Sequence, residues 1–310
     1  MPTTRFSIII TSYNQREFIK DAVGSALSLR NAEREIIVVD DASTDGSQEI
    51  LRKYGDAIRL ICGETNQGAC AARNCGAALA SGEYLVFLDG DDTFLPWALD
   101  VYERIVQAKK PRMILGRMRW FTGMLPALQP EDTPHEIRIV EYQDYLRKDR
   151  PFGTSASALV MDRQSFQAAQ GWPTDLWPME DQDFVLRLGD CGRTIQILSP
   201  PTTFHRSHAA NTVKHVQPFI PSLYKIIHNE RAGEYPGGEL RRRDRRAIIG
   251  GLVVFWAKRA AKAGLYGTAL KLLAGGWPLV WMGATRRLGV VLKGRRPCET
   301  IEMAKPNMSR

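Results

Sequence analysis

The first half of the chain alternates short apolar runs with amphipathic stretches. The runs cover residues 6–11, 35–40, 58–62 and 83–89. They are too continuous for half-exposed strands and indicate central strands that are covered on both faces. Between them, apolar residues recur at helical spacing from Phe18 to Leu27, and Ser43 to Asp45 supply caps for a second helix. Strands and helices in alternation predict a doubly wound, parallel α/β sheet with helices on both faces.

Beyond residue 112 the pattern becomes less regular. Further strands are predicted at 113–121, 157–161, 194–198 and 202–206, and helices near 143–146 and 183–188. We expect these strands to extend the same sheet, which then becomes mixed. Pro236 to Gly238 break the pattern before a helical, apolar-rich region that ends near Gly294. The predicted domains are therefore an α/β domain over 1–235 and a basic helical tail over 236–310.

Charge is distributed unevenly between these two parts. The 310-residue chain has a net charge of +8, but residues 1–235 carry 26 basic and 30 acidic side chains, whereas residues 236–310 carry 16 basic and 4 acidic ones. Because the larger part is slightly acidic, a protein that binds nucleic acid is disfavoured. The tail is the part that would contact an anionic surface.

The composition is that of an ordinary globular protein, with 44% hydrophobic and 25% charged residues. Five cysteines are an odd number without a CxxC pair, so neither a disulfide framework nor a thiolate zinc site is indicated. They suit a reducing cytoplasm. The run that starts at Phe6 is not preceded by the pattern of a secretory leader, and we expect a cytoplasmic protein.

Acidic residues cluster at the carboxyl ends of two predicted strands, where ligands bind in doubly wound sheets. Asp40 and Asp41 close the second strand, and residues 89–92, with the sequence DGDD, close the fourth. Carboxylates this close repel one another unless they share a cation, so the second cluster indicates a site for Mg²⁺ or Mn²⁺ that carries a phosphate. The alternative is a solvated turn with a capping aspartate.

The loop after the first strand contains no glycine. Its sequence, TSYNQ at 11–15, is therefore neither a dinucleotide fingerprint nor a Walker loop. Dehydrogenases and P-loop enzymes are excluded at this position. The hydroxyl, phenol and amide groups of the loop suit contacts to a base or a ribose.

Five short motifs follow one another along the chain. They are TSYN at 11–14, VDDASTD at 39–45, NQG at 66–68 leading to ARNCG at 72–76, GEYLVFLDGDD at 82–92, and ED at 180–181. Together, over roughly residues 5–215, they resemble a family 2 glycosyltransferase with the GT-A fold. The resemblance implies a metal-dependent inverting enzyme that uses a nucleotide-diphosphate sugar, and UDP-sugars are favoured over dTDP- or GDP-sugars.

The resemblance also implies a nucleotide site. Thr11 and Tyr13 would line the nucleotide pocket, and Asp41 would accept a hydrogen bond from the base. Arg73 would approach the nucleotide, and Asp89 the ribose or the sugar. The structural alternatives are that Asp40 or Asp41 only caps the next helix and that Arg73 only pairs with an acidic neighbour.

The same resemblance places a metal site around Asp91. This aspartate would hold the Mn²⁺ or Mg²⁺ ion that bridges the two phosphates, where the ion acts as a Lewis acid on the leaving group. His208, in the segment FHRSHAANT at 204–212, matches the family's histidine that contacts metal or diphosphate. His205 departs from the aromatic residue that is common at its position. A purely structural histidine is the alternative for His208.

Glu180 and Asp181 occupy the family's place for the catalytic base. A single displacement needs a base on the face opposite the leaving diphosphate, because the acceptor oxygen attacks in line. We assign Asp181 as the base and Glu180 as the residue that orients the acceptor. The dipole of the helix that starts here is expected to keep Asp181 ionised. The alternative is that these carboxylates merely decorate the first helical turn.

The acceptor side is least defined by the sequence. Trp120, Phe121, Trp172 and Trp177 would suit a sugar platform, but tryptophans at such positions are commonly core residues. A hydroxyl of a glycan or of a lipid-linked acceptor, in surface polysaccharide synthesis, is the expected target.

The tail contains no apolar run of about 20 residues, the length that a membrane-spanning helix needs. Trp256, Trp277 and Trp281 lie among basic residues behind the arginine cluster at 241–246. This pattern indicates an interfacial element beside an anionic leaflet, at the inner face of the plasma membrane. A helical subdomain that packs on the α/β domain is the equal alternative.

Two other classes of function are compatible with parts of the sequence. The sequence DGDDT at 89–93 also resembles the nucleophile motif of haloacid-dehalogenase-type phosphatases, in which Asp89 would attack phosphorus. That motif usually closes the first strand, and it leaves Asp41 and the pair at 180–181 unexplained. An inactive nucleotide-binding scaffold is the third class, but Asp91 and Asp181 are both present.

Overall fold

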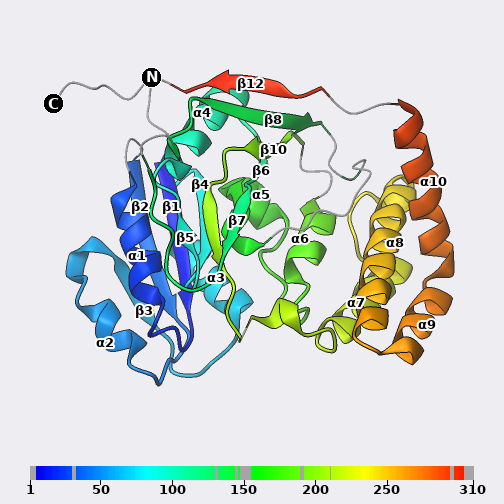
Figure 1. Cartoon of the computed structure of the whole chain (residues 1–310), viewed down its shortest axis with the longest axis horizontal. Coiled ribbons are helices and arrows are strands. Elements are labelled where there is room, and N and C mark those ends of the chain that lie inside the picture. Colours follow the sequence, from blue (N-terminus) through cyan, green and yellow to red (C-terminus); the bar gives the residue numbers. More distant parts are fainter. Residues whose placement is uncertain are drawn as a thin grey trace.

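A computed structural model describes residues 5–29, 33–129, 132–143, 146, 155–188, 192–209, 211–293 and 297–303, with only the backbone of 287–293. Figure 1 shows a central sheet with helices on both faces and a group of helices at one end. The expected helix near 143–146 lies partly outside the described residues.

The central sheet has nine strands in the order β12-β8-β10-β6-β9-β4-β1-β2-β3. Their bounds are β1 Arg5–Ser12, β2 Glu33–Asp40, β3 Arg59–Cys62, β4 Tyr84–Asp89, β6 Met113–Leu115, β8 Glu136–Tyr142, β9 Leu159–Asp162, β10 Thr194–Ser199 and β12 Glu299–Glu302. The strands β1 to β4 pair in parallel, whereas β9 is antiparallel to both β4 and β6. The predicted α/β fold with a mixed sheet is confirmed.

Alternate residues of the central strands enter two separate core layers. In β1, Ile8 and Ile10 pack in one layer, whereas Ile9 packs in the other, and all three are fully buried. The first layer contains apolar residues of α1 (Ile19–Ser28) and α4 (Ala98–Lys109), and the second contains those of α3 (Ala69–Leu79) and α6 (Glu180–Leu188). Helices that cover both faces explain why these strands are continuously apolar.

Three strands form a second, small sheet in the order β5-β11-β7, with bounds β5 Thr93–Phe94, β7 Met118–Phe121 and β11 Thr203–Arg206. The expectation that 113–121 and 202–206 would extend the main sheet is confirmed for 113–115, which is β6, and is wrong for 118–121 and 203–206, which form β7 and β11 of the small sheet. Directly after β6 the Gly116 amide still donates to the Ala158 carbonyl at 2.7 Å, and the chain then enters β7 of the small sheet. The small sheet brings β11 next to the turn that follows β4.

The remaining short helices are α2 (Ser47–Arg52) and α5 (Arg163–Ala168). The tail forms α8 (Gly238–Lys262), α9 (Tyr266–Gly275) and α10 (Trp277–Lys293), which follow α7 (Phe219–Ala232). Apolar residues of α6, α7, α8 and α9 share a third core, so the tail helices pack on the α/β domain. The tail then returns to the central sheet through β12, which pairs with β8 and which the sequence pattern did not predict. None of the described helices is both long and apolar enough to cross a membrane.

Candidate active site

A large cavity lies at the carboxyl ends of β1, β2 and β4 and has a volume of about 1720 Å³. Pockets for single small ligands measure roughly 300–1,000 Å³, so this one has room for a nucleotide sugar and part of a second substrate. Eight of the nine predicted site residues line it, namely Thr11, Tyr13, Asp41, Arg73, Asp89, Asp91, Asp181 and His208. Glu180 is not among the lining residues. The sequence-distant motifs thus converge on one cavity.

Two neighbouring aspartates at the end of β2 have different surroundings. Asp40 accepts hydrogen bonds from the Ser43 amide at 2.8 Å and the Ser43 hydroxyl at 2.6 Å, so it caps the following turn. Asp41 lines the cavity and accepts the backbone amides of Gln67 and Gly68 at 2.9 and 2.7 Å. The structural alternative therefore applies to Asp40, whereas Asp41 keeps lone pairs for a further hydrogen bond.

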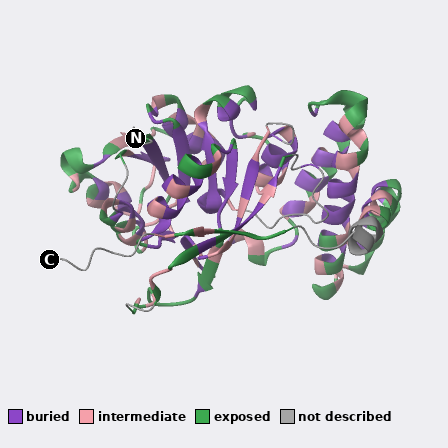
Figure 2. Cartoon of the chain, turned by 90° about the horizontal axis from the view of Figure 1, so that it is seen from above, coloured by how far each residue is buried: buried purple, intermediate pink, exposed green. Residues whose placement is uncertain are grey.

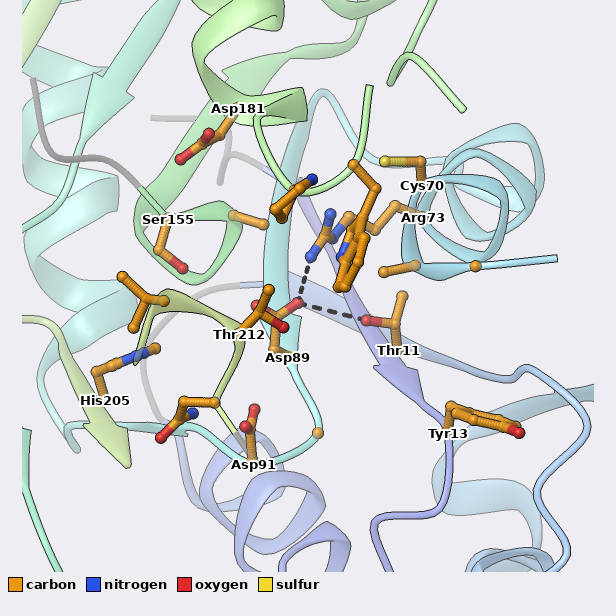
Figure 3. A pocket seen from close by; sticks show the side chains of 18 of the residues that line it. Thr11, Tyr13, Cys70, Arg73, Asp89, Asp91, Ser155, Asp181, His205 and Thr212 are labelled. Atoms are coloured by element: carbon orange, nitrogen blue, oxygen red, sulfur yellow. Dashed lines mark hydrogen bonds and ion pairs between the residues drawn. The ribbon is translucent and has the colours of Figure 1, made fainter. Parts of the chain in front are cut away.

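Arg73 joins two carboxylates from different parts of the chain. Its Nη2 donates to Asp89 Oδ1 at 2.7 Å, and its Nη1 donates to Glu180 Oε1 at 3.1 Å. Thr11 Oγ1 also donates to Asp89 Oδ1, at 3.5 Å, as Figure 3 shows. Burial acts to raise the pKa of Asp89, but the guanidinium outweighs it and the pKa is lowered. Asp89 is therefore held ionised at the floor of the cavity.

Glu180 faces Arg73 instead of the cavity. Its side chain is largely buried, and its Oε2 has no hydrogen-bond partner among the described residues. This geometry favours a positioning role over direct contact with an acceptor. The sequence treated Glu180 and Asp181 as one acidic pair, but the first turn of α6 points them in different directions.

The turn after β4 holds the proposed metal ligand. Gly90 is required there because a Cβ would lie 2.8 Å from the Thr11 carbonyl oxygen of the neighbouring strand. Asp91 Oδ2 lies 2.8 Å from His208 Nε2. Asp92 is fully buried, where it accepts the Arg206 amide at 3.0 Å and contacts His205 Nδ1 at 2.9 Å. Asp91 and Asp92 thus have different roles, the first in the cavity and the second beneath it.

The carboxylates in the turn after β4 repel one another, and a bound divalent cation would reduce this repulsion. Burial, followed by the charges of Asp92 and Asp89, raises the pKa of Asp91 to about 6. Within the described ranges, no group of three or more His, Cys, Asp or Glu side chains is arranged to hold a metal ion. Asp91 and His208 fit a hard ion such as Mg²⁺ or Mn²⁺ that takes its remaining ligands from substrate phosphates and water.

Asp181 lies in the first turn of α6 and faces the cavity. In Figure 3 it lies on the opposite side of Asp89 from Asp91. Burial, followed by the charge of Glu180, raises the pKa of Asp181 to about 8. This direction is opposite to the one expected from the helix dipole, because burial and the charge of Glu180 both favour the protonated form.

Two of the four candidate aromatic residues reach the cavity. Trp120 and Trp177 line it and are 54% and 52% exposed, whereas Phe121 and Trp172 are core residues. The Trp120 ring also packs edge-on against His205, with ring centroids 4.1 Å apart. The sequence alone could not separate these residues, because tryptophan is common in both settings.

The tail contributes residues that the sequence did not assign to the site. Phe255 and Arg259 of α8 line the cavity, as does Lys214 from the segment before α7. The Arg259 guanidinium lies over the Trp256 ring, 5.3 Å from its centroid, and donates to the Val213 carbonyl at 2.6 Å. The cavity therefore has an acidic donor side and an aromatic, basic side.

Comparisons with known proteins identify the family of the chain. A sequence model described as Glycosyl transferase family 2 matches residues 7–166, more than half of the chain. The chain belongs to glycosyl transferase family 2.

Curated relatives include TuaG of Bacillus subtilis (strain 168), which is assigned as a teichuronic acid biosynthesis glycosyltransferase. TuaG is 42% identical to this chain over 145 residues, which make up 46% of this chain and 56% of TuaG. WfaP of Escherichia coli, a UDP-Glc:alpha-D-GlcNAc-diphosphoundecaprenol beta-1,3-glucosyltransferase, is 47% identical over 88 residues, 28% of this chain and 35% of WfaP. The chain spans about half or less of the length of these two relatives.

Solved structures show the same fold. TarS 1–349 of S. aureus in complex with UDP-GlcNAc aligns with a TM-score of 0.60 at 18% identity, over 81% of this chain and 72% of TarS. The mannosyltransferase PcManGT of Pyrobaculum calidifontis in complex with GDP-Man and Mn²⁺ aligns with a TM-score of 0.54 at 17% identity, over 93% and 88% of the two chains. At these sequence identities, the alignments show that the fold is shared and do not extend to the function.

Proposed function

We propose that the chain is a metal-dependent inverting glycosyltransferase that moves a sugar from a nucleotide-diphosphate donor, UDP-sugar above all, to an acceptor hydroxyl. The observation that carries this proposal is the single cavity lined by Asp41, Asp91 and Asp181 at the carboxyl ends of the strands. The TarS complex with UDP-GlcNAc and the PcManGT complex with Mn²⁺ support the choice of donor and metal.

The donor would occupy the acidic side of the cavity. Asp41 and Tyr13 would hold the base, Thr11 would lie along the nucleotide, and Asp89 would contact the ribose or the sugar. Arg73 would fix the Asp89 carboxylate through its 2.7 Å bond, and Glu180 would in turn fix Arg73. The phosphatase alternative leaves unexplained why Asp41 and Asp181 line the same cavity as Asp89, so the arrangement does not favour it.

Asp91 and His208 would hold Mn²⁺ or Mg²⁺. When bound, the ion would offset the negative charge that grows on the departing diphosphate. On the other side of Asp89, a carboxylate oxygen of Asp181 would take the proton of the acceptor hydroxyl. The acceptor oxygen then forms the new bond to C1 as the bond from C1 to the diphosphate oxygen breaks, and the configuration at C1 inverts.

The acceptor would lie against the aromatic, basic side of the cavity. Trp120 and Trp177 would stack on a sugar ring, and Arg259 and Lys214 would accommodate negative charge next to it. A lipid-linked diphosphate acceptor, as in the name of WfaP, fits this chemistry. The activity would then belong to the synthesis of a cell-surface polysaccharide, and the name of TuaG, a teichuronic acid biosynthesis glycosyltransferase, supports this proposal.

Turnover and stereochemistry test this function together. UDP release from UDP-glucose, UDP-galactose and UDP-N-acetylglucosamine would be measured with Mn²⁺ and two kinds of acceptor, nitrophenyl glycosides and an alkyl-diphosphate-linked N-acetylglucosamine. The expected product has the anomeric configuration opposite to that of the donor, read from its proton NMR coupling. A product that retains the configuration would contradict the single displacement.

The acceptor kcat/KM is expected to depend on pH through Asp181. A base acts in its ionised form, and the pKa of Asp181 is raised to about 8, so activity is low below that pH and reaches a plateau above it. We expect kcat/KM to rise about tenfold between about pH 7 and pH 9. The measurement keeps donor and Mn²⁺ saturating at each pH. A flat or falling profile would exclude Asp181 as the base.

A further inference from the structure

The last two helices leave a row of large apolar side chains exposed. Their exposed fractions are Tyr266 69%, Leu270 68%, Leu273 36%, Trp277 62% and Trp281 61%. Within each helix they recur every three or four residues, which places them on one side of that helix. We call these five residues the α9–α10 face. It lies at the end of the molecule opposite β3 (Figure 1), among the exposed segments that Figure 2 shows in green.

Close packing of α10 on α8 fixes the orientation of this face. A Cβ on Gly250 would lie 1.9 Å from the Leu279 carbonyl oxygen, so the two helices are in backbone contact there. Leu279 is buried, whereas Trp277 and Trp281, two positions before and after it, are exposed. The tryptophans are therefore held outward by the fold.

Along the sequence, the charge of the helices that carry this face has almost entirely one sign. Residues 245–298 contain eleven lysines and arginines and no aspartate or glutamate, a stretch of 54 residues. Lys258, Lys262 and Lys271 are exposed, and none of them lies within ion-pair distance of a carboxylate in the part of the chain that the structure describes. Lys262 ends α8 four residues before Tyr266, and Lys271 follows Leu270 directly on α9.

The arginine cluster is a different element from this face. Arg245 is buried, with its Nε 2.6 Å from Glu230 Oε2, and Arg246 lies 3.3 Å from Glu230 Oε1. Arg241 pairs with Asp244 at 3.1 Å. These three arginines anchor α8 to α7 and to its own first turns, so they are not assigned to the α9–α10 face.

We propose that the α9–α10 face docks the protein on an anionic membrane surface. Its aromatic and leucine side chains would enter the headgroup region, and Lys258, Lys262 and Lys271 would contact lipid phosphates. A second copy of the chain fits less well, because a symmetric contact would bring the same lysines together with no acidic residue among 245–298 to pair them.

Docking in this way would also serve the active site. The helix α8 packs against α9 and α10 and lines the cavity with Phe255 and Arg259. The docked face and the acceptor side of the cavity would therefore be connected through α8. The docking proposal does not depend on the transferase activity, so the two fail separately.

Vesicle flotation tests the proposal. The full chain would be mixed with vesicles of phosphatidylglycerol and phosphatidylcholine in equal parts, or of phosphatidylcholine alone. We expect flotation with the anionic vesicles that weakens in high salt, and at least about a tenfold loss of partitioning for the double variant Trp277→Ser, Trp281→Ser. Each of Lys258→Glu, Lys262→Glu and Lys271→Glu should cost about fivefold.

Met124→Ser is the matched control, because Met124 is 91% exposed but lies outside the face. It should float as the unaltered chain does, and circular dichroism should show that every variant is folded. Light scattering gives the oligomeric state. Absence of flotation with anionic vesicles, full flotation of the double tryptophan variant, or a dimer that this variant converts to a monomer would each overturn the proposal, the last in favour of a second copy.

Discussion

Asp181→Asn is expected to lower kcat by roughly 10²- to 10⁴-fold, the usual contribution of a positioned general base. Asparagine keeps the size of the side chain but cannot take a proton from the acceptor. Because Asp181 lies on the other side of Asp89 from Asp91, the variant should bind UDP and Mn²⁺ within about twofold of the unaltered protein. Initial rates and equilibrium binding measured on the same preparation separate the two effects.

Asp175→Asn is the control for this variant. Asp175 lies shortly before α6 and forms an exposed ion pair with Lys225, so its loss should leave both rate and binding unchanged. If Asp181→Asn kept a near-normal kcat, the base would have to be another residue. If it lost donor binding as well, Asp181 would belong to the donor site.

Asp91→Ala is expected to weaken Mn²⁺-dependent UDP binding by about 10²-fold or more. Loss of a residue that orients a metal ligand lowers metal affinity by about 10- to 100-fold, and loss of the ligand itself should cost at least as much. The change removes one of the two proposed protein ligands and leaves His208 alone. It also removes a carboxylate that Asp89 and Asp92 repel, so the folded protein should not become less stable by the loss of that charge. Fluorescence-detected Mn²⁺ titration with UDP present measures the effect.

Asp56→Ala serves as the matched variant, because Asp56 is an exposed aspartate that does not line the cavity. It should bind Mn²⁺ and UDP as the unaltered protein does. Asp91→Ala binding equal to that of Asp56→Ala would remove Asp91 from the metal site.

The parts of the fold that local periodicity determines were predictable. The continuous apolar run at 6–11 and the alternation of helices and strands require a sheet covered on both faces, and β1 has that environment. The small second sheet and β12 were not predictable, because their pairing depends on contacts distant in sequence. Thr300 pairs with Arg138, and nothing in the local sequence of either segment specifies this partner.

In the candidate site, too, some residues were predictable from the local sequence and others depended on contacts distant in sequence. Asp41 and Asp91 were found because they follow apolar strands, and parallel strands place their carboxyl ends at one edge. The contribution of Arg259 was missed because it lies in the tail, beyond the predicted domain boundary. The orientation of Glu180 toward Arg73 was missed because sequence spacing cannot say which residues of a helical turn face a cavity. The pKa of Asp181 depends on the same three-dimensional burial.

Isothermal titration calorimetry tests the central claim most directly. UDP, GDP and dTDP would each be titrated into the full chain with Mn²⁺ present and again with EDTA. If one cavity holds a nucleotide diphosphate through a cation at Asp91, UDP binds saturably with Mn²⁺, more tightly than the other two nucleotides, and loses its heat signal in EDTA. Equal UDP affinity in EDTA, or no binding of any of the three nucleotides, would contradict the account.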